Sequence, residues 1–283
     1  MRSLLLCLFA LATTIWLQSG EIPTSAFKVM TFNLRFASDE PPNSWPERRP
    51  VMQECLKLTQ PDIIGTQEGV YRQIKDLAHD LPVYDWIGLG RDGGSKGEFM
   101  AVFYKKERFE PLAFDHFWLS DTPDLIASTT WGNSNRRMVT WVQFRDRATK
   151  KEFYFLNTHL DHQIQEARIK SAHLINKKIS EFPPALPLIL LGDFNASAGK
   201  NEVYDLLLKE QQLVDSWSAA TMRHGEMVHT FHGYRGIKKG DDRIDWILFR
   251  GPFTVHSTEI VTFSKNAQFP SDHFPVIAEL ELK

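Results

Sequence analysis

The chain has 283 residues, of which 42% are hydrophobic and 24% are charged. This composition is typical of a folded globular protein, and the length is enough for one large domain or two small ones. The formal net charge of −2 excludes an overall attraction to polyanions, although a local basic groove would be compatible with it.

The first 20 residues are predicted to be a secretory signal peptide, with cleavage between positions 20 and 26. Arg2 supplies the positive start, and a mostly apolar stretch over Leu4–Leu17 is followed by small residues. The stretch is shorter than the roughly 20 residues that a membrane-spanning helix needs. We therefore expect a secreted or periplasmic protein with no membrane span after processing. Cleavage would leave Cys55 as the single cysteine, so the domain would contain no internal disulfide.

Residues 27–283 are predicted to form one domain, because they contain no repeat, low-complexity tract or linker. Its first part alternates strands with helices. Apolar runs predict a strand over Phe27–Phe36 and a second over Asp62–Glu68, and a short helix is expected over Tyr71–Leu81.

A longer helix is expected between these two strands. Ser44-Trp45-Pro46-Glu47 is a capping-box motif, with proline at the first helical position. Val51, Cys55 and Leu58 follow at helical spacing and predict one apolar face.

Aromatic and β-branched residues dominate the next part of the chain, which predicts strands. These are expected over Phe99–Tyr104, Phe109–Leu119, Met138–Phe144 and Phe153–Leu156. The aromatic residues near Phe114–Leu119 alternate as in a core strand and are expected to be buried. The glycine-rich stretch Gly88–Gly97 lacks phosphate-loop spacing and a following helix, so we interpret it as a loop near the site.

The last part of the chain begins with a long helix predicted over Gln163–Phe182 and ended by two prolines. The elements expected after it are a strand over Pro187–Leu191, a helix over Glu202–Glu210, and strands over Arg243–Phe249, Phe253–Phe263 and Pro275–Leu282. Many strands with helices outside them suggest two packed sheets covered by helices.

Short polar motifs follow apolar runs at six points of this domain. They are Thr31-Phe32-Asn33, Thr66-Gln67-Glu68, Asn157-Thr158-His159, Gly192-Asp193-Phe194-Asn195, Arg243-Ile244-Asp245 and Ser271-Asp272-His273. Carboxylates, amides and imidazoles are unfavourable at the inner end of a buried strand unless they are paired or bind a metal. The pattern therefore suggests one polar site assembled from distant strand ends.

Local explanations exist for single motifs. Glu68 alone could be a favourable carboxylate at the N-terminus of the following helix. The motif around Asp193 could be an ordinary Asx-turn. All six motifs together are much more specific than any one of them.

In this order the six motifs resemble those of the endonuclease/exonuclease/phosphatase superfamily, and the resemblance extends from about Phe27 to the C-terminus. It implies an α/β fold, a four-layered sandwich of two packed mixed β-sheets flanked by helices. It also implies a Mg²⁺-dependent phosphoesterase, with Mn²⁺ as a substitute. Oxygen ligands suit Mg²⁺, which keeps several waters and needs few carboxylates.

The resemblance also implies roles for single residues. Asn33, Glu68 and Asp272 would hold the metal, partly through water. Asp193 would orient and polarise the attacking water, and Asn195 would donate to a phosphate oxygen.

Two carboxylate–imidazole pairs are implied as acid–base and oxyanion groups. His273 is expected to pair with Asp245, and His159 with Glu98. The sequence does not decide which histidine is the acid.

Arg137 precedes the strand at Met138–Phe144, where the deoxyribonuclease branch has a phosphate-contacting arginine, although the match could slip by one residue to Arg136. His162 and Arg168 are expected as substrate contacts, with a solvated helix face as the alternative. The aromatic residues Trp45, Trp131 and those of Thr230–Tyr234 are expected to pack loops rather than to stack on a ligand.

We therefore predict a secreted, Mg²⁺-dependent hydrolase that cleaves a phosphodiester by attack of a metal-assisted water. The substrate would be a nucleic acid, a phospholipid head group or a phosphorylated glycan, and the protein is expected to be a monomer. One alternative is a phosphomonoesterase acting on a sugar or inositol phosphate. Another is an inactive module that binds a phosphorylated ligand, although no residue of the pattern is missing.

Overall fold

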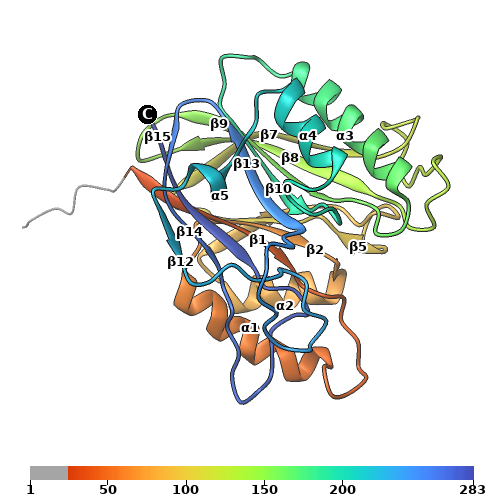
Figure 1. Cartoon of the computed structure of the whole chain (residues 1–283), viewed down its shortest axis with the longest axis vertical. Coiled ribbons are helices and arrows are strands. Elements are labelled where there is room, and N and C mark those ends of the chain that lie inside the picture. Colours follow the sequence, from red (N-terminus) through yellow and green to blue (C-terminus); the bar gives the residue numbers. More distant parts are fainter. Residues whose placement is uncertain (1–24) are drawn as a thin grey trace, which may run out of the picture.

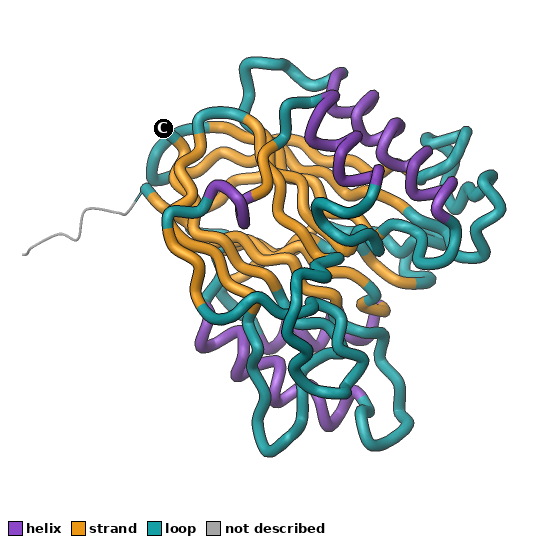
Figure 2. The backbone as a smooth tube through the Cα atoms, viewed as in Figure 1, coloured by secondary structure: helices purple, strands orange, loops and turns teal. Residues whose placement is uncertain are grey.

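The computed structural model describes residues 25–283, so the predicted signal peptide lies outside the described residues. Two β-sheets pack face to face, and helices cover the outer face of each (Figures 1 and 2). The predicted four-layered α/β sandwich is confirmed. Among residues 25–283, no helix combines the length and the apolar character that crossing a bilayer would require.

The first sheet has seven strands and is formed mainly by the two ends of the chain. In spatial order its strands are β12 (Met222–His224), β14 (Phe253–Ile260), β15 (Val276–Leu282), β1 (Ala26–Asn33), β2 (Ile63–Gln67), β6 (Val102–Lys105) and β4 (Tyr84–Ile87). β1 pairs in parallel with β2 and antiparallel with β15. Helices α1 (Trp45–Thr59) and α2 (Tyr71–Asp80) pack on its outer face.

The second sheet has six strands from the middle of the chain. In spatial order they are β11 (Val214–Asp215), β13 (Asp245–Arg250), β10 (Leu188–Asp193), β9 (Glu152–His159), β8 (Met138–Asp146) and β7 (Phe109–Trp118). Helices α3 (Gln165–Ser180) and α4 (Glu202–Glu210) cover its outer face. The remaining elements are the short pair β3 (Gly69–Val70) and β5 (Glu98–Phe99), and the single turn α5 (Ser216–Ala219).

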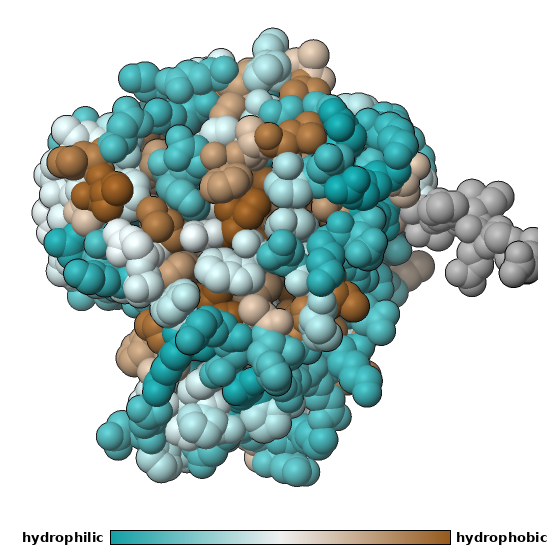
Figure 3. Space-filling model, turned by 180° about the vertical axis from the view of Figure 1, so that it is seen from behind, coloured by the Kyte–Doolittle hydropathy of each residue, from teal (hydrophilic) through white to brown (hydrophobic). Residues whose placement is uncertain are grey.

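Three apolar clusters join the four layers. The central cluster lies between the sheets and includes Ile63 from the first and Phe155 and Ile247 from the second, all with no exposed surface. A second cluster joins α3 and α4 to the six-stranded sheet, and a third joins α1 and α2 to the seven-stranded sheet. A core of this size stabilises the domain without a disulfide, and Cys55 of α1 is a buried free thiol. Seen from behind, hydrophobic residues form separate patches among polar ones (Figure 3).

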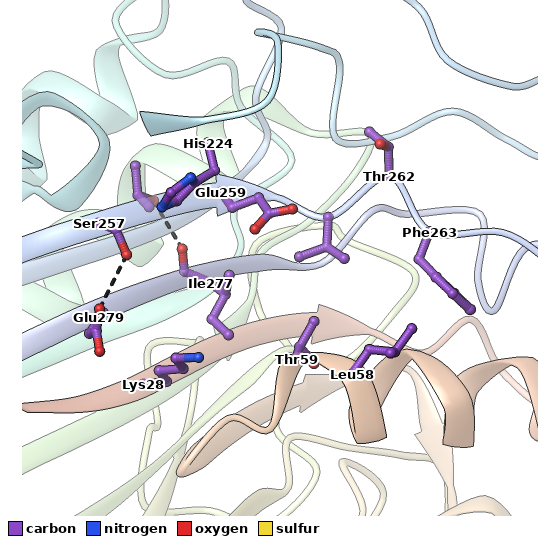
Figure 4. A pocket seen from close by; sticks show the side chains of 12 residues that line it. Lys28, Leu58, Thr59, His224, Ser257, Glu259, Thr262, Phe263, Ile277 and Glu279 are labelled. Atoms are coloured by element: carbon purple, nitrogen blue, oxygen red, sulfur yellow. Dashed lines mark hydrogen bonds between the residues drawn. The ribbon is translucent and has the colours of Figure 1, made fainter. Parts of the chain in front are cut away.

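Helix α1 begins at the predicted capping box. The Ser44 N–H donates to the Glu47 carboxylate at 3.0 Å, and the Ser44 side chain accepts from the helix. Trp45 is the first helical residue, so Pro46 occupies the second position and not the first as predicted. Leu58 is 66% exposed and does not belong to the buried face, because it lines the open cavity at the end of α1 (Figure 4).

The first strand ends at Asn33 and not at Phe36 as predicted. Arg35 has a φ of 51°, which breaks the extended backbone. The fully buried guanidinium of Arg48 donates to the carbonyl oxygens of Leu34 at 2.7 Å and Pro270 at 2.9 Å, and also to those of Arg35 and Phe36. Arg48 thereby ties the loop after β1 to the loop before Ser271-Asp272.

Two further expectations change. The strand predicted over 99–104 is divided into β5 and β6, because Phe99 pairs with Gly69 in a separate ribbon. Phe114 is 56% exposed, although Phe117 and Trp118 are buried as predicted. β7 is the edge strand of its sheet, so alternation along it does not place every aromatic residue in a core.

Candidate active site

Strand register brings the polar motifs to one end of the sandwich. In the six-stranded sheet, Asp193 at the end of β10 lies beside His159 of the parallel strand β9 and Asp245 of the antiparallel strand β13. In the other sheet, Asn33 at the end of β1 lies beside Gln67 of the parallel strand β2. Because the carboxyl ends of parallel strands meet at one edge, residues far apart in sequence become neighbours.

A cavity of about 600 Å³ opens at this end. Most of the predicted site residues line it, namely Glu68, Glu98, Arg137, His159, His162, Asp193, Asn195, Asp272 and His273. Asn33 and Asp245 lie beneath it, fully or almost fully buried, and are hydrogen-bonded to residues of the wall.

A second cavity, of about 710 Å³, lies on the outer side of the seven-stranded sheet next to the end of α1 (Figure 4). It presents Lys28, Glu259 and Glu279, but its charged groups do not converge on one point. Within the described part of the chain, the groups of three acidic or histidine side chains that lie close enough to share one ion are Glu68–His159–Asp193 and Asp193–Asp245–His273. The cavity with the larger volume is therefore not the one that holds the clustered carboxylates and histidines, and we take the cavity at the strand ends as the candidate active site.

Asn33 organises the carboxylates of the floor. Its amide nitrogen donates to Glu68 Oε1 at 3.0 Å and to Asp193 Oδ2 at 2.9 Å, and its amide oxygen accepts from the Arg35 N–H at 2.9 Å. In this arrangement Asn33 offers the site hydrogen-bond donors and not the oxygen ligand that was predicted. The reason is local, since the turn at Arg35 directs a backbone N–H at the amide oxygen.

Two carboxylates converge on one cation at the mouth of the cavity. The Arg35 guanidinium lies 3.6 Å from Glu68 Oε2 and 3.7 Å from Asp272 Oδ2. Burial raises the pKa of Asp272, and the charge of Glu68 adds to this effect. Like charges held this close favour a cation between them, and oxygen donors of this kind suit a hard divalent ion. The residues therefore fit the metal that the resemblance implies.

His273 forms the predicted pair with Asp245, with 3.0 Å between Nδ1 and Oδ2. Its Nε2 lies 3.8 Å from Asp193 Oδ2. Burial alone would lower the pKa of His273, but the carboxylates of Asp245 and Asp193 outweigh it and raise that pKa to about 10. His273 is therefore an imidazolium at neutral pH.

His159, in contrast to His273, is a neutral imidazole. Burial, together with the cations of Arg137 and Arg91, lowers its pKa well below the ordinary value, so this histidine is neutral. Its Nε2 lies 3.5 Å from Asp193 Oδ2, and its Nδ1 is buried with no hydrogen-bond partner in residues 25–283.

The predicted pair of His159 with Glu98 is wrong. The Glu98 carboxylate accepts instead from Arg91 at 2.5 Å. Arg91 belongs to the glycine-rich loop, which was expected near the site but without a named role. Burial raises the pKa of Glu98 to about 6 despite this cation.

Asp193 lies between the two imidazoles at the end of β10. Burial raises its pKa to about 7, and the charge of Asp245 contributes. Its Oδ1 accepts from the Asn195 N–H at 2.9 Å, which forms the Asx-turn considered from the sequence. Gly192 is required for close approach, because a Cβ there would lie 2.1 Å from the Thr158 carbonyl oxygen.

Arg137, and not Arg136, lines the cavity. Arg137 is 4% exposed, its Nη2 lies 3.1 Å from His162 Nδ1, and its Nε and Nη1 have no hydrogen-bond partner among the described residues. Arg136 donates to the Ala127 carbonyl oxygen and to Asp92, away from the cavity. The Arg137 Nε lies 3.9 Å from Asp161 Oδ2. A buried guanidinium in the cavity wall with N–H groups that donate no hydrogen bond is suited to an anion.

Arg168 was predicted as a substrate contact but does not line the cavity. Its guanidinium donates to Gln165 and to the Asp161 carbonyl oxygen at the start of α3. The alternative of a helix-face residue is therefore the correct one, because these local acceptors hold the side chain at the helix terminus.

Residues for which no role in the site was predicted complete the wall of the cavity. They are Arg35, Phe36, Arg91, Asn135, Phe231 and Ile244. Phe231 is 47% exposed and its ring lies 5.0 Å from that of His273, whereas Trp45 is buried and donates to Asp76 as a packing residue. Phe231 and Arg91 could have been suspected, since the aromatic residues of 230–234 were weighed as groups that stack on a ligand and the loop 88–97 was expected near the site.

A two-sheet sandwich with a buried aspartate between two imidazoles at its strand ends defines a class of hydrolytic phosphoesterases. The family model described as "Endonuclease/Exonuclease/phosphatase family" matches residues 30–273. The chain belongs to this family.

Three similar proteins illustrate the relationship. An endonuclease/exonuclease/phosphatase family protein from Bacteroides thetaiotaomicron is 35% identical, with a TM-score of 0.86 over 91% of this chain and 95% of that one. The mannosyl-6-phosphatase Bt3783 of the same bacterium is also 35% identical, with a TM-score of 0.82 over 90% of this chain and 99% of that one. Uncharacterized protein L388 of Acanthamoeba polyphaga mimivirus is 29% identical over 251 residues, which are 84% of this chain and 92% of that protein.

Proposed function

We propose that this protein is a Mg²⁺-dependent phosphoesterase that hydrolyses its substrate by direct attack of water, with Mn²⁺ as a substitute. One observation carries the proposal. The Asp193 carboxylate lies within 4 Å of two imidazoles, those of His159 and His273, in the cavity that also holds two converging carboxylates. The inactive binding module is not favoured, because every group needed for hydrolysis is present.

Glu68 and Asp272 would hold the divalent ion, in the place that Arg35 now shares with them. The bound ion would neutralise charge on the phosphate oxygens. Asn33 would keep the Glu68 and Asp193 carboxylates in place through its two donated hydrogen bonds.

The remaining residues would move the proton and bind the phosphate. Asp193 would accept a proton from the attacking water, since its raised pKa makes it a stronger base than an ordinary aspartate. The His273 imidazolium would stabilise charge on the phosphoryl oxygens and protonate the leaving alkoxide. Arg137 would donate from its guanidinium, whose Nη1 has no hydrogen-bond partner among the described residues, to a phosphate oxygen next to neutral His159.

Two substrate classes fit this chemistry. The sequence favours a phosphodiester in a nucleic acid, a phospholipid head group or a phosphorylated glycan. The second candidate is a sugar phosphate monoester, and the similarity to a protein named mannosyl-6-phosphatase favours it. A cavity of about 600 Å³ also suits a single sugar phosphate. We therefore expect the monoester to be the better substrate.

The test is a comparison of substrates with the purified full chain. Mannose 6-phosphate, bis-p-nitrophenyl phosphate and plasmid DNA are each incubated with Mg²⁺, with chelator, and with the Asp193→Asn variant. Phosphate release that requires both the metal and Asp193 supports the proposal and identifies the ester class. Equal turnover by wild type and variant on every substrate would contradict it.

We further propose that the protein is exported and acts as a monomer. The apolar stretch near its start supports export. Expression in a bacterial host should yield a shortened chain in the periplasm or medium, and light scattering should give the mass of one chain. A full-length chain in the cytoplasm, or the mass of a dimer, would contradict these two points.

A further inference from the structure

A third cavity, of about 400 Å³, lies directly beyond the active-site cavity. The two cavities share Phe231 and Ile244 as common wall residues. The far cavity is formed mainly by the loop that follows Phe231, over residues 232–238. A group bound at the strand ends could therefore extend past Phe231 into this space.

Phe231 is fixed as a partition between the two cavities. Its backbone forms an isolated antiparallel bridge with His273, and its ring lies 5.0 Å from the His273 ring. The ring is nevertheless 47% exposed. The Phe231 ring thus contacts His273, the proposed proton donor to the leaving group, on one side, and the rest of the ring is open to ligand or solvent.

The far cavity is basic. Arg235 and Lys238 line it, and within the part of the chain that the structure describes, neither side chain forms a hydrogen bond or an ion pair. The acidic residue of the wall, Asp242, is already engaged, since it lies 3.4 Å from His229 Nδ1 and accepts from the Ser197 hydroxyl. Two exposed cations without side-chain partners among the described residues therefore line the cavity.

Arg235 is next to the partition. A Cβ placed on Gly233 would lie 3.4 Å from the end of the Phe231 ring and 3.8 Å from Arg235 Nε. The guanidinium and the aromatic ring thus flank the same point of the loop. An aromatic face beside a free cation suits a ring-shaped group that carries an anion.

We propose that this basic cavity binds an anionic group on the leaving alcohol, so that the preferred substrate is a sugar phosphate carrying a second phosphate or carboxylate. The inference rests on the proposed function, because the reacting phosphate defines which part of the substrate leaves. Phe231 would hold the sugar ring, and Arg235 and Lys238 would bind the second anion. The role is one of specificity and not of catalysis.

The experiment compares mannose 6-phosphate with mannose 1,6-bisphosphate, which differ only in the second phosphate. Wild type is expected to show a kcat/KM about tenfold higher for the bisphosphate. Two exposed ion pairs, from Arg235 and Lys238 to the second phosphate, would provide an effect of about this size. The double variant Arg235→Gln, Lys238→Gln should bring the ratio to about one and leave the monophosphate rate unchanged. Lys239→Gln is the matched control, because Lys239 is adjacent but pairs with Glu226 at 2.8 Å.

Each result decides the inference. A ratio of about one in wild type, or an equal ratio in wild type and double variant, would overturn it, and so would loss of the preference in Lys239→Gln alone. If wild type hydrolyses neither sugar, the expected preference for a sugar monoester fails, and calorimetric binding of the two sugars then decides the inference separately. Binding of the bisphosphate about tenfold tighter to wild type than to the double variant supports the basic cavity, and equal binding contradicts it.

Discussion

The floor of the active-site cavity is built from strand ends, whereas its rim is built from loops. On the floor, Asn33, Asp193 and Asp245 are at most 1% exposed and are joined to each other or to His273 by hydrogen bonds. On the rim, Phe231 is 47% exposed and the Arg35 side chain 41%. Strand register therefore determines the chemistry, and loops that tolerate change determine which ester is presented to it.

Removal of divalent metal should have the largest effect, because Glu68, Asp272 and the substrate phosphate would lose their main counter-charge. With excess chelator we expect hydrolysis of a phosphate ester to fall to the rate without enzyme, and Mg²⁺ to restore it. The measurement is phosphate release before and after dialysis. Activity that persists after exhaustive chelation would show that Arg35 alone can serve Glu68 and Asp272.

Asp193→Asn tests the floor itself. The amide keeps the size of the side chain but cannot accept a proton from water, so kcat should fall about 10²- to 10⁴-fold. The melting temperature should stay close to that of wild type, since the shape is kept. A fall of less than fivefold would assign the base to another residue, and neutral His159 would be the next to test.

Arg137→Lys tests the wall between floor and rim, with Arg136→Lys as its matched control. Lysine keeps the charge but loses the planar fork, so we expect kcat/KM to fall about 10- to 100-fold in the first variant. Arg136 faces Ala127 and Asp92, so the second variant should stay within twofold of wild type. Equal effects of the two changes would contradict this distinction.

The pH dependence of kcat/KM should reflect the floor and not the rim. Asp193 must be ionised to accept a proton, so the rate should rise with pH, reach half of its plateau near pH 7, where its pKa lies, and level off above that pH. Bound Mg²⁺ would favour the ionised carboxylate and move this limb to lower pH. His273 keeps its proton up to about pH 10, so the rate should not fall between pH 7 and 9. A descending limb in that interval would argue against His273 as the proton donor.

Phe231→Leu should have the smallest effect. Loss of the aromatic face next to His273 should raise KM for a sugar phosphate a fewfold, with little change in kcat, because the ring contacts no reacting atom in the proposed arrangement. Steady-state kinetics on mannose 6-phosphate give both parameters. A drop in kcat larger than the rise in KM would instead indicate that the ring positions His273.

The same contrast explains what could be predicted from the sequence. The motifs that contain Asn33, Asp193 and Asp245 follow apolar runs, and such strand ends can be expected to meet at one edge of a sheet without knowledge of the loops. The pair of His159 with Glu98 was wrong because Arg91, seven residues before Glu98, takes that carboxylate in a loop whose path no periodic pattern determines. Arg168 was misplaced for a similar reason, since local acceptors at the start of α3 hold it.

The predicted burial of side chains in helices and strands was also only partly correct. Helical spacing correctly groups Val51 with Cys55, but it also includes Leu58, which lines an open cavity and is exposed. Phe114 alternates correctly in an edge strand and is still exposed. Periodicity gives the faces of an element, whereas the neighbours that cover each face depend on the whole fold.

The buried thiol in α1 has a practical consequence for studying the rim. Cys55 has no exposed surface, and burial raises the pKa of its thiol to about 12, so it should not react with maleimides or iodoacetamides at neutral pH. A cysteine introduced at exposed Ile237, in the wall of the basic cavity, would then be the reactive thiol of residues 25–283. A fluorophore attached there could report ligand entry in real time, without prior removal of the native cysteine.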